Sequence, residues 1–171
     1  MALARGTMRL ESYKEAWVER FEDEADRLRA IFGDRAPIEH IGSTAIPGMM
    51  AKPIIDMMVG VESLDVVSQA MVAKLENMGY RSMPDRVTQD EIFMPKGPDS
   101  RRTHYLHIVP RSNRRWHNTV LFRNYLRAHP AAREEYADLK RKLAIQYPDD
   151  RASYTDAKTG FVADILRRAT Q

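Results

Sequence analysis

Apolar residues recur at helical spacing near the start of the chain. The stripe consists of Tyr13, Trp17, Phe21, Ala25, Leu28 and Phe32. Steps of three to four residues put these side chains on one face of an amphipathic helix, and charged residues fill the other faces. Gly33 follows directly and is typical of a helix C-terminus. We expect this stripe to pack in the hydrophobic core and not to bind a cofactor.

Two apolar segments after this helix favour β-strands. Residues 37–41 (PIEHI) form a short candidate strand, and residues 53–61 (PIIDMMVGV) are apolar on both faces apart from Asp56. A run that is apolar on both faces is typical of a strand buried inside a sheet. Residues 42–50, between the two strands, are predicted to form a loop or a short helix.

The next part of the chain alternates helical and strand patterns, and the remainder is helical. Residues 64–78 have helical spacing and end at Gly79. Three further candidate strands are residues 80–83, 91–95 and 104–110. The turn-rich sequence KGPDSRR between the last two predicts a β-hairpin. Pro130 and the sequence YPDD interrupt the helical part, and a last helix is marked by Tyr154, Ala157, Phe161 and Ile165.

This order of elements predicts an α/β or α+β domain, with a small mixed sheet flanked by helices and a helical C-terminal part. The 171 residues suit one domain over residues 1–171. Its core is expected over about residues 9–111 and its C-terminal helices over about residues 118–170. The exposed faces of those helices could support a homodimer.

Composition narrows the class of protein. Hydrophobic residues make up 43% and charged residues 30% of the chain, which is ordinary for a globular domain. No apolar run approaches the roughly 20 residues of a membrane span, and we expect neither a membrane partner nor a secretory signal. The absence of cysteine excludes thiolate sites and is compatible with the cytoplasm. A net charge of +3 gives no support for a nucleic-acid partner. Met8 is an alternative first residue of the translated protein.

The sequence HIGSTAIPGMMAKPIIDMMV, from His40 to Val59, carries the candidate chemistry. Gly42 lets the backbone approach a ligand, and Ser43 and Thr44 add hydroxyl donors at a turn that could grip phosphate. Lys52 is either a surface lysine or a group that neutralises phosphate. The segment is no P-loop, because it does not end in Gly-Lys-Ser/Thr.

Asp56 is the more informative residue of this segment. A carboxylate inside an apolar strand is costly unless it is paired, hydrogen-bonded or bound to metal. It is therefore either a strand-end residue that accepts from local N–H groups or a ligand- or metal-binding group. His40 is either structural or catalytic.

Two further features are compatible with an anionic ligand or a catalytic histidine. The basic residues Lys96, Arg101, Arg102, Arg111, Arg114 and Arg115 form a solvated loop or hold an anion. His104 and His107 lie three apart on a candidate strand, so they face opposite sides and only one can reach a given site. No spacing typical of a zinc site occurs.

The segment IEHIGSTAIPGMMAKPIIDMMVGV strongly resembles the GrpB family of bacterial proteins. The similarity extends along nearly the whole chain and includes RTHYLHIV, LFRNYLRAHP and YTDAKTGFV. The same kind of domain is also found fused to dephospho-CoA kinases. This chain has no Walker A motif, so the resemblance does not imply kinase activity.

The resemblance implies a nucleotidyltransferase-like fold, which has Gly-Ser after its first strand and Asp-x-Asp or Asp-x-Glu on the next. Gly42 and Ser43 match the first element and Asp56 the first acid, and in the superfamily these elements bind nucleoside triphosphate and magnesium. Met58 stands where the second acid would be. His107 is expected nearest the place of a missing third acid, as a manganese or zinc ligand or a general base, and Glu91 is a second candidate.

Three functional hypotheses follow from these residues. The first is a transferase that moves a nucleotidyl group onto an unknown acceptor. In this hypothesis Ser43 and Thr44 hold phosphates, and Lys52 and Arg102 neutralise charge. Asp56, with His107, binds magnesium or manganese or acts as a catalytic base. The second is a non-catalytic module that binds a nucleotide, a CoA-like metabolite or another phosphorylated ligand. The third is an interaction protein with a vestigial pocket. Further candidate site residues are His40, Glu91, His104 and Lys158.

Overall fold

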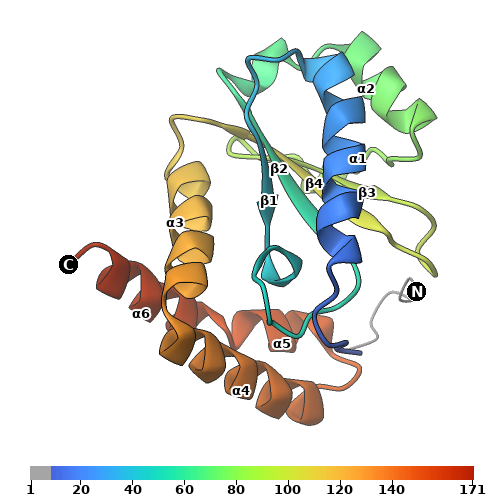
Figure 1. Cartoon of the computed structure of the whole chain (residues 1–171). Helices are drawn as coiled ribbons and strands as arrows, with labels where there is room; N and C mark the ends of the chain where they lie inside the picture. The colour runs from blue at the N-terminus through green and yellow to red at the C-terminus, as the bar shows by residue number, and fades with distance from the viewer. Residues whose placement is uncertain (1–8) are drawn as a thin grey trace.

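The protein, seen in a computed structural model that describes residues 9–171, is built on a four-stranded mixed sheet (Figure 1). The strands are β1 (Ile38–Ile41), β2 (Ile55–Val61), β3 (Ile92–Lys96) and β4 (His104–Pro110), in the spatial order β1-β2-β4-β3. The central pair, β2 and β4, is parallel, and the two outer pairs are antiparallel. The predicted mixed sheet and the predicted β3–β4 hairpin are confirmed. The alternative start at Met8 lies outside the described residues.

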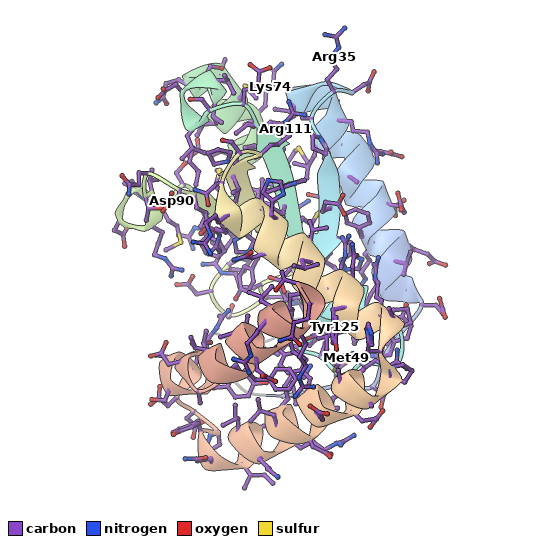
Figure 2. The ribbon with its side chains drawn as sticks, turned by 90° about the vertical axis from the view of Figure 1, so that its left-hand side faces the viewer. Arg35, Met49, Lys74, Asp90, Arg111 and Tyr125 are labelled. Carbon is purple, nitrogen blue, oxygen red and sulfur yellow. The ribbon has the colours of Figure 1, made fainter. Side chains whose placement is uncertain are left out.

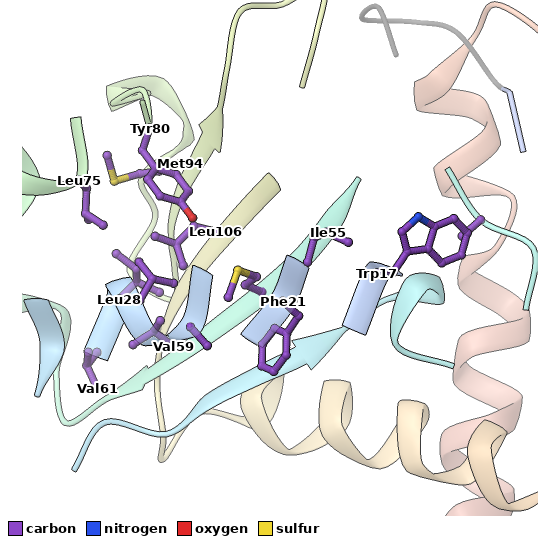
Figure 3. Packing of buried hydrophobic residues seen from close by; sticks show 14 residues of the cluster. Trp17, Phe21, Leu28, Ile55, Val59, Val61, Leu75, Tyr80, Met94 and Leu106 are labelled. Carbon is purple, nitrogen blue, oxygen red and sulfur yellow. The ribbon is translucent and has the colours of Figure 1, made fainter. Parts of the chain in front are cut away.

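One face of the sheet packs against α1 (Ala16–Phe32) and α2 (Gln69–Asn77). The predicted aromatic stripe supplies Trp17 and Phe21 to this core, and alternate residues of β2 meet them, as Figure 3 shows for Ile55 and Val59. Since side chains on a strand alternate between faces, this packing turns Asp56 and Met58 toward the opposite face. The core therefore sets the direction of the candidate site.

The opposite face is covered by α3 (Arg114–Ala128), and three helices lie across the end of the sheet where β2 and β4 begin (Figure 1). These helices are α4 (Pro130–Gln146), α5 (Arg151–Asp156) and α6 (Thr159–Ala169). A second apolar cluster joins Met49 of the loop before β2 to α3, α4 and α6. Figure 2 shows Met49 close to Tyr125 at this junction. The C-terminal helices are thereby fixed against the loop that carries the Gly-Ser pair.

Three predicted elements differ from the structure. Residues 80–83 are not a strand, because only Tyr80 forms a bridge, to Lys96. The predicted helix over residues 64–78 is divided into the 3₁₀ turn η2 (Leu64–Val66) and α2, since the Ser68 side chain accepts from a backbone N–H and starts a new helix. The predicted last helix is likewise two, α5 and α6. Among residues 9–171, no helix is long and apolar enough to cross a membrane.

Candidate functional site

The loop after β1 folds directly against Asp56. Gly42 has φ +70°, and Ser43–Ala45 form the 3₁₀ turn η1 immediately after it. A Cβ atom at position 42 would lie 2.6 Å from Asp56 Oδ2. Glycine is thus required here for two reasons, the left-handed backbone and the close approach of the carboxylate. The Gly-Ser pair and Asp56 are brought together, as expected.

Asp56 lies on the central strand β2 and is only partly buried, with 31% of its side chain exposed. A cavity adjoins the strand at this position. On the parallel neighbour β4, Tyr105 is level with Asp56 and His107 with Met58. These four side chains share one face of the sheet.

His107 connects Asp56 to a second acid. Its Nε2 lies 3.9 Å from Asp56 Oδ1, and its Nδ1 is hydrogen-bonded to Glu91, which also pairs with Arg115 at 2.9 Å. Burial acts to lower the pKa of His107, but the hydrogen bonds and charges of Asp56 and Glu91 outweigh it and raise the pKa. His107 is thus close to Asp56, and Glu91 contacts His107; their roles at a metal or in catalysis stay predictions.

A cavity of about 130 Å³ adjoins Asp56. Its wall is formed by the loop around Ser43 and Lys52, by β2 and β4, and by α4 and α5. The residues that line it are Leu10, Ser43, Thr44, Ala51, Lys52, Ile54, Asp56, Tyr105, Lys140, Arg151, Tyr154, Thr155 and Lys158. The cavity therefore combines the Gly-Ser loop with basic residues from the C-terminal helices. We call it the lysine cavity.

Three lysines of the lysine cavity are desolvated. Burial, followed by the charges of neighbouring basic groups, lowers the pKa of Lys52 to about 8 and that of Lys140 to about 7. Burial also lowers the pKa of Lys158, although the charge of Asp56 opposes this. The ammonium groups of Lys52 and Lys158 lie 5.1 and 4.6 Å from the centroid of the Tyr154 ring. One carboxylate, Asp56, faces this group of cations.

Two basic residues of the cavity were missed in the sequence. Arg151 donates to the Tyr105 hydroxyl at 2.7 Å, and Lys140, 2% exposed, donates to the Met50 carbonyl. Lys140 stands four residues after Tyr136, on the apolar face of α4. A lysine in an apolar stripe was the signal that could have identified it. Arg151 follows an exposed turn and gave no comparable signal.

Several predicted site residues lie away from the lysine cavity. His40 faces α1, where its ring stacks on Phe21 at 4.7 Å, and burial lowers its pKa to about 4. His104 also faces α1, and burial lowers its pKa to about 4. Arg102 is hydrogen-bonded to the Gly97 carbonyl and to Asp99 within the β3–β4 turn. Thr44 lines the cavity, but its hydroxyl is 2.9 Å from His40 Nε2.

A second cavity of about 500 Å³ adjoins the first and shares Tyr105, Arg151 and Thr155 with it. Its other lining residues are Met83, Arg86, Phe93, Pro95, Arg102, Asp149, Ala152 and Asp156. This cavity has both acidic and basic residues beside apolar and aromatic ones. The predicted basic loop therefore contributes only Arg102 to a cavity near Asp56.

The donor set around Asp56 is poor for magnesium. Magnesium prefers six oxygen ligands, whereas Asp56 is joined here by an imidazole that is already bonded to Glu91. Met58, at the position of the second acid, is 1% exposed and packs with Ile41 and Val109. Over residues 9–171, no group of three or more histidine or acidic side chains is arranged to hold a metal ion. A metal at Asp56 and His107 remains a prediction.

Comparison with known proteins places the chain among bacterial relatives. The Glutamate-rich protein GrpB of Alkalihalophilus pseudofirmus is 40% identical over 172 residues, which cover 97% of this chain and 98% of that protein. YqkA of Bacillus subtilis is 40% identical over 88% of this chain, which spans only 43% of that relative. A Mycobacterium bovis protein named dephospho-CoA kinase is 29% identical over 98% of this chain and 47% of its own length.

Solved structures show the same relationship and the fold. The crystal structure of GrpB from Enterococcus faecalis has 37% identity and a TM-score of 0.84, over 94% of this chain and 96% of that one. The Cid1 poly(U) polymerase bound to MgGTP has 15% identity and a TM-score of 0.54, over 78% of this chain and 44% of the polymerase. The latter likeness shows a nucleotidyltransferase-like fold. The model of the GrpB protein family matches residues 7–168, and the chain belongs to that family.

Proposed function

We propose that this chain binds a small phosphorylated ligand, a nucleotide or a CoA-like metabolite, in the lysine cavity. The observation that carries the proposal is a charge imbalance: over residues 9–171, Lys52, Lys140, Lys158 and Arg151 line one cavity with the single carboxylate of Asp56. Buried cations are unfavourable unless an anion accompanies them. A phosphate group has the charge and the acceptor oxygens to compensate them.

The second cavity supports a ligand larger than a phosphate group. It shares a wall with the lysine cavity and is lined by Phe93 and Tyr105 together with polar residues. Aromatic side chains beside polar and charged groups can contact the rest of a ligand whose phosphate lies in the lysine cavity. Two similar proteins support the ligand class, since the poly(U) polymerase structure contains MgGTP and the mycobacterial relative is named for dephospho-CoA.

A thermal-shift screen with ATP, UTP, CoA and inorganic pyrophosphate tests the proposal. A ligand that binds the native state at 100 times its Kd stabilises it by about 2.7 kcal/mol, so binding raises the melting temperature. The shift should be lost in Lys158→Met and kept in Lys142→Met, which removes an exposed lysine from the same region. No shift with any of these ligands, or an equal shift in both variants, would contradict the proposal.

Nucleotidyl transfer is a second candidate for the same cavity. The proximity of Asp56 to both Gly42 and His107 favours it, because an acid beside a phosphate-binding loop is the arrangement that such chemistry uses. The test is release of pyrophosphate from nucleoside triphosphates in the presence of magnesium or manganese. Activity that is lost in Asp56→Asn would establish transfer, whereas binding without turnover would leave a binding module.

A further inference from the structure

Lys140 is a buried lysine beside other cations. Its side chain is 2% exposed and donates to the Met50 carbonyl, and its ammonium lies 5.2 Å from the centroid of the Tyr136 ring. Among the residues that the structure describes, no ion pair involves Lys140. A lysine ammonium has three donors and a full charge, so one carbonyl and one ring satisfy it incompletely.

The charged groups around Lys140 come from every element packed against it. Burial is the largest cause that lowers the pKa of Lys140, and the charges of Lys158 at the start of α6, Lys52 in the loop before β2 and Arg141 on α4 lower it further. Across the cavity, α5 contributes Arg151 and β2 contributes Asp56. The nearby hydroxyls are those of Tyr105, Tyr136 and Tyr154, and burial raises the pKa of the latter two. The net charge of the groups around Lys140 is therefore positive.

The same cavity is poorly equipped for a divalent cation. Among the described residues that line it, Asp56 is the only carboxylate, and the position two residues further along β2 is the buried Met58. A magnesium ion in this cavity would have one carboxylate to attract it, whereas Arg151 and the protonated forms of the three lysines would repel it. An anion entering the same space meets the opposite balance. The geometry favours direct contact between phosphate oxygens and the lysines.

From this arrangement we infer that the ligand anion is bound without a divalent cation and that Lys140 takes up a proton when it binds. The inference rests on the proposed function and specifies how that site neutralises its ligand. The proton comes from solvent, and the anion then stabilises the ammonium form of Lys140 by a charge-assisted hydrogen bond. The buried lysines thus take the role that a metal has in sites with several carboxylates.

The inference has a defined dependence on pH. Burial lowers the pKa of ligand-free Lys140 to about 7, so the amine is mostly neutral at pH 8. Anion binding then requires protonation, and affinity should fall as pH rises above 7, by up to about tenfold per pH unit for one coupled proton. Lys52 has a pKa of about 8, so its loss of a proton should continue the decrease in ligand affinity toward higher pH.

Titration calorimetry on the full chain tests both parts. ATP and inorganic pyrophosphate are titrated at pH 8 in EDTA and in magnesium, and the ATP titration is repeated in Tris and in HEPES, which differ in ionisation enthalpy. We expect magnesium to improve the Kd by no more than about twofold. We expect the ATP enthalpy to depend on the buffer, with uptake of up to about one proton, because its phosphates are already ionised at this pH.

A matched pair of variants assigns the proton. Lys140→Met should weaken ATP binding by about tenfold and reduce the buffer dependence to the smaller part that Lys52 contributes, whereas Lys142→Met, on the same helix but exposed, should change neither. Circular dichroism establishes that both variants fold. Should Lys140→Met fail to fold, Lys140→Arg, which keeps the charge at all pH values used, should remove the part of the proton uptake that belongs to Lys140.

The failures of the two proposals are distinguishable. Binding that appears only with magnesium, or that takes up no proton at pH 8, overturns this inference and leaves the proposed function standing. Absence of binding by ATP and pyrophosphate under both conditions overturns the inference and contradicts the proposed function.

Discussion

Gly42 is the residue through which the backbone of the loop and the carboxylate of Asp56 meet. Its φ of +70° and its distance to Asp56 leave no room for a side chain. Gly48, in the same loop, has a similar φ of +80°, but nothing lies within 4 Å of the place of its Cβ. The pair therefore separates backbone strain from the contact with Asp56.

Gly42→Ala should destabilise the chain by more than Gly48→Ala. The left-handed backbone costs alanine about 1 kcal/mol at either position, and the clash with Asp56 adds at least about 1 kcal/mol at position 42. Urea unfolding of the two variants measures the difference. Equal losses of stability would mean that the loop moves away from Asp56 without cost, contrary to the geometry described above.

A second prediction for a single residue concerns the pKa of His107. Glu91→Gln removes a hydrogen-bonded charge that raises the pKa of His107, so this pKa should fall. Titration of the imidazole by NMR measures it. Asp90→Asn is the control, because Asp90 contacts Asn113 instead. An unchanged His107 pKa in Glu91→Gln would show that Glu91 does not contact the ring in solution.

Among the elements, β2 determines which chemistry the cavity can have. Its alternation places Ile55 and Met57 in the core under α1, and Asp56 and Met58 on the other face. That alternation was readable from the sequence, and His107 was expected on a neighbouring strand, but the parallel direction of β4 was not predicted. The extent of the cavity was not, because the exposure of Asp56 depends on the packing of helices more than 80 residues away.

Met58→Asp tests whether β2 can be converted to the two-acid pattern. The new carboxylate would be buried with Ile41, Val109 and Trp116, so it should cost at least about 3 kcal/mol of stability. Met58→Leu, which conserves volume, should cost less than about 1.5 kcal/mol. Urea unfolding compares them. A Met58→Asp variant as stable as Met58→Leu would mean that position 58 has access to solvent or to a cation.

The C-terminal helices show where prediction from sequence was incomplete. Their presence was expected from the spacing of Tyr136, Leu139 and Leu143, but the break between α5 and α6 was not. Lys140 looked like part of an ordinary amphipathic helix. Only the placement of α4 and α5 across the end of the sheet brings Lys140 and Arg151 to the Gly-Ser loop (Figure 1). Long-range packing of this kind leaves little trace in local periodicity.

For the molecule as a whole, the buried lysines predict how stability changes with pH. The folded pKa of Lys140 is about 7, against 10.5 for an ordinary lysine, so the unfolded chain binds more protons between these values. Stability of the ligand-free protein should therefore rise with pH from about 7 to about 10. Lys52 and Lys158 act in the same direction.

Thermal unfolding between pH 7 and pH 10, in a buffer without polyvalent anions, measures this effect. Lys140→Met should be more stable than wild type near pH 7 by about 1 kcal/mol or more, since it replaces a buried cation by an apolar side chain. The stability of this variant should also increase less between pH 7 and pH 10 than that of the wild type. Lys142→Met serves as the control. Stability that is constant or falls over this range would indicate that the lysines are solvated.

The central claim is that phosphate occupies the lysine cavity in direct contact with the lysines. The most direct measurement is a crystal structure of the full chain with inorganic pyrophosphate in EDTA. The account predicts pyrophosphate oxygens within hydrogen-bond distance of Lys52, Lys140 and Lys158, beside the turn at Ser43 and with no metal ion. Pyrophosphate bound only elsewhere on the surface, or a cavity that stays free of it at saturating concentration, would contradict the account.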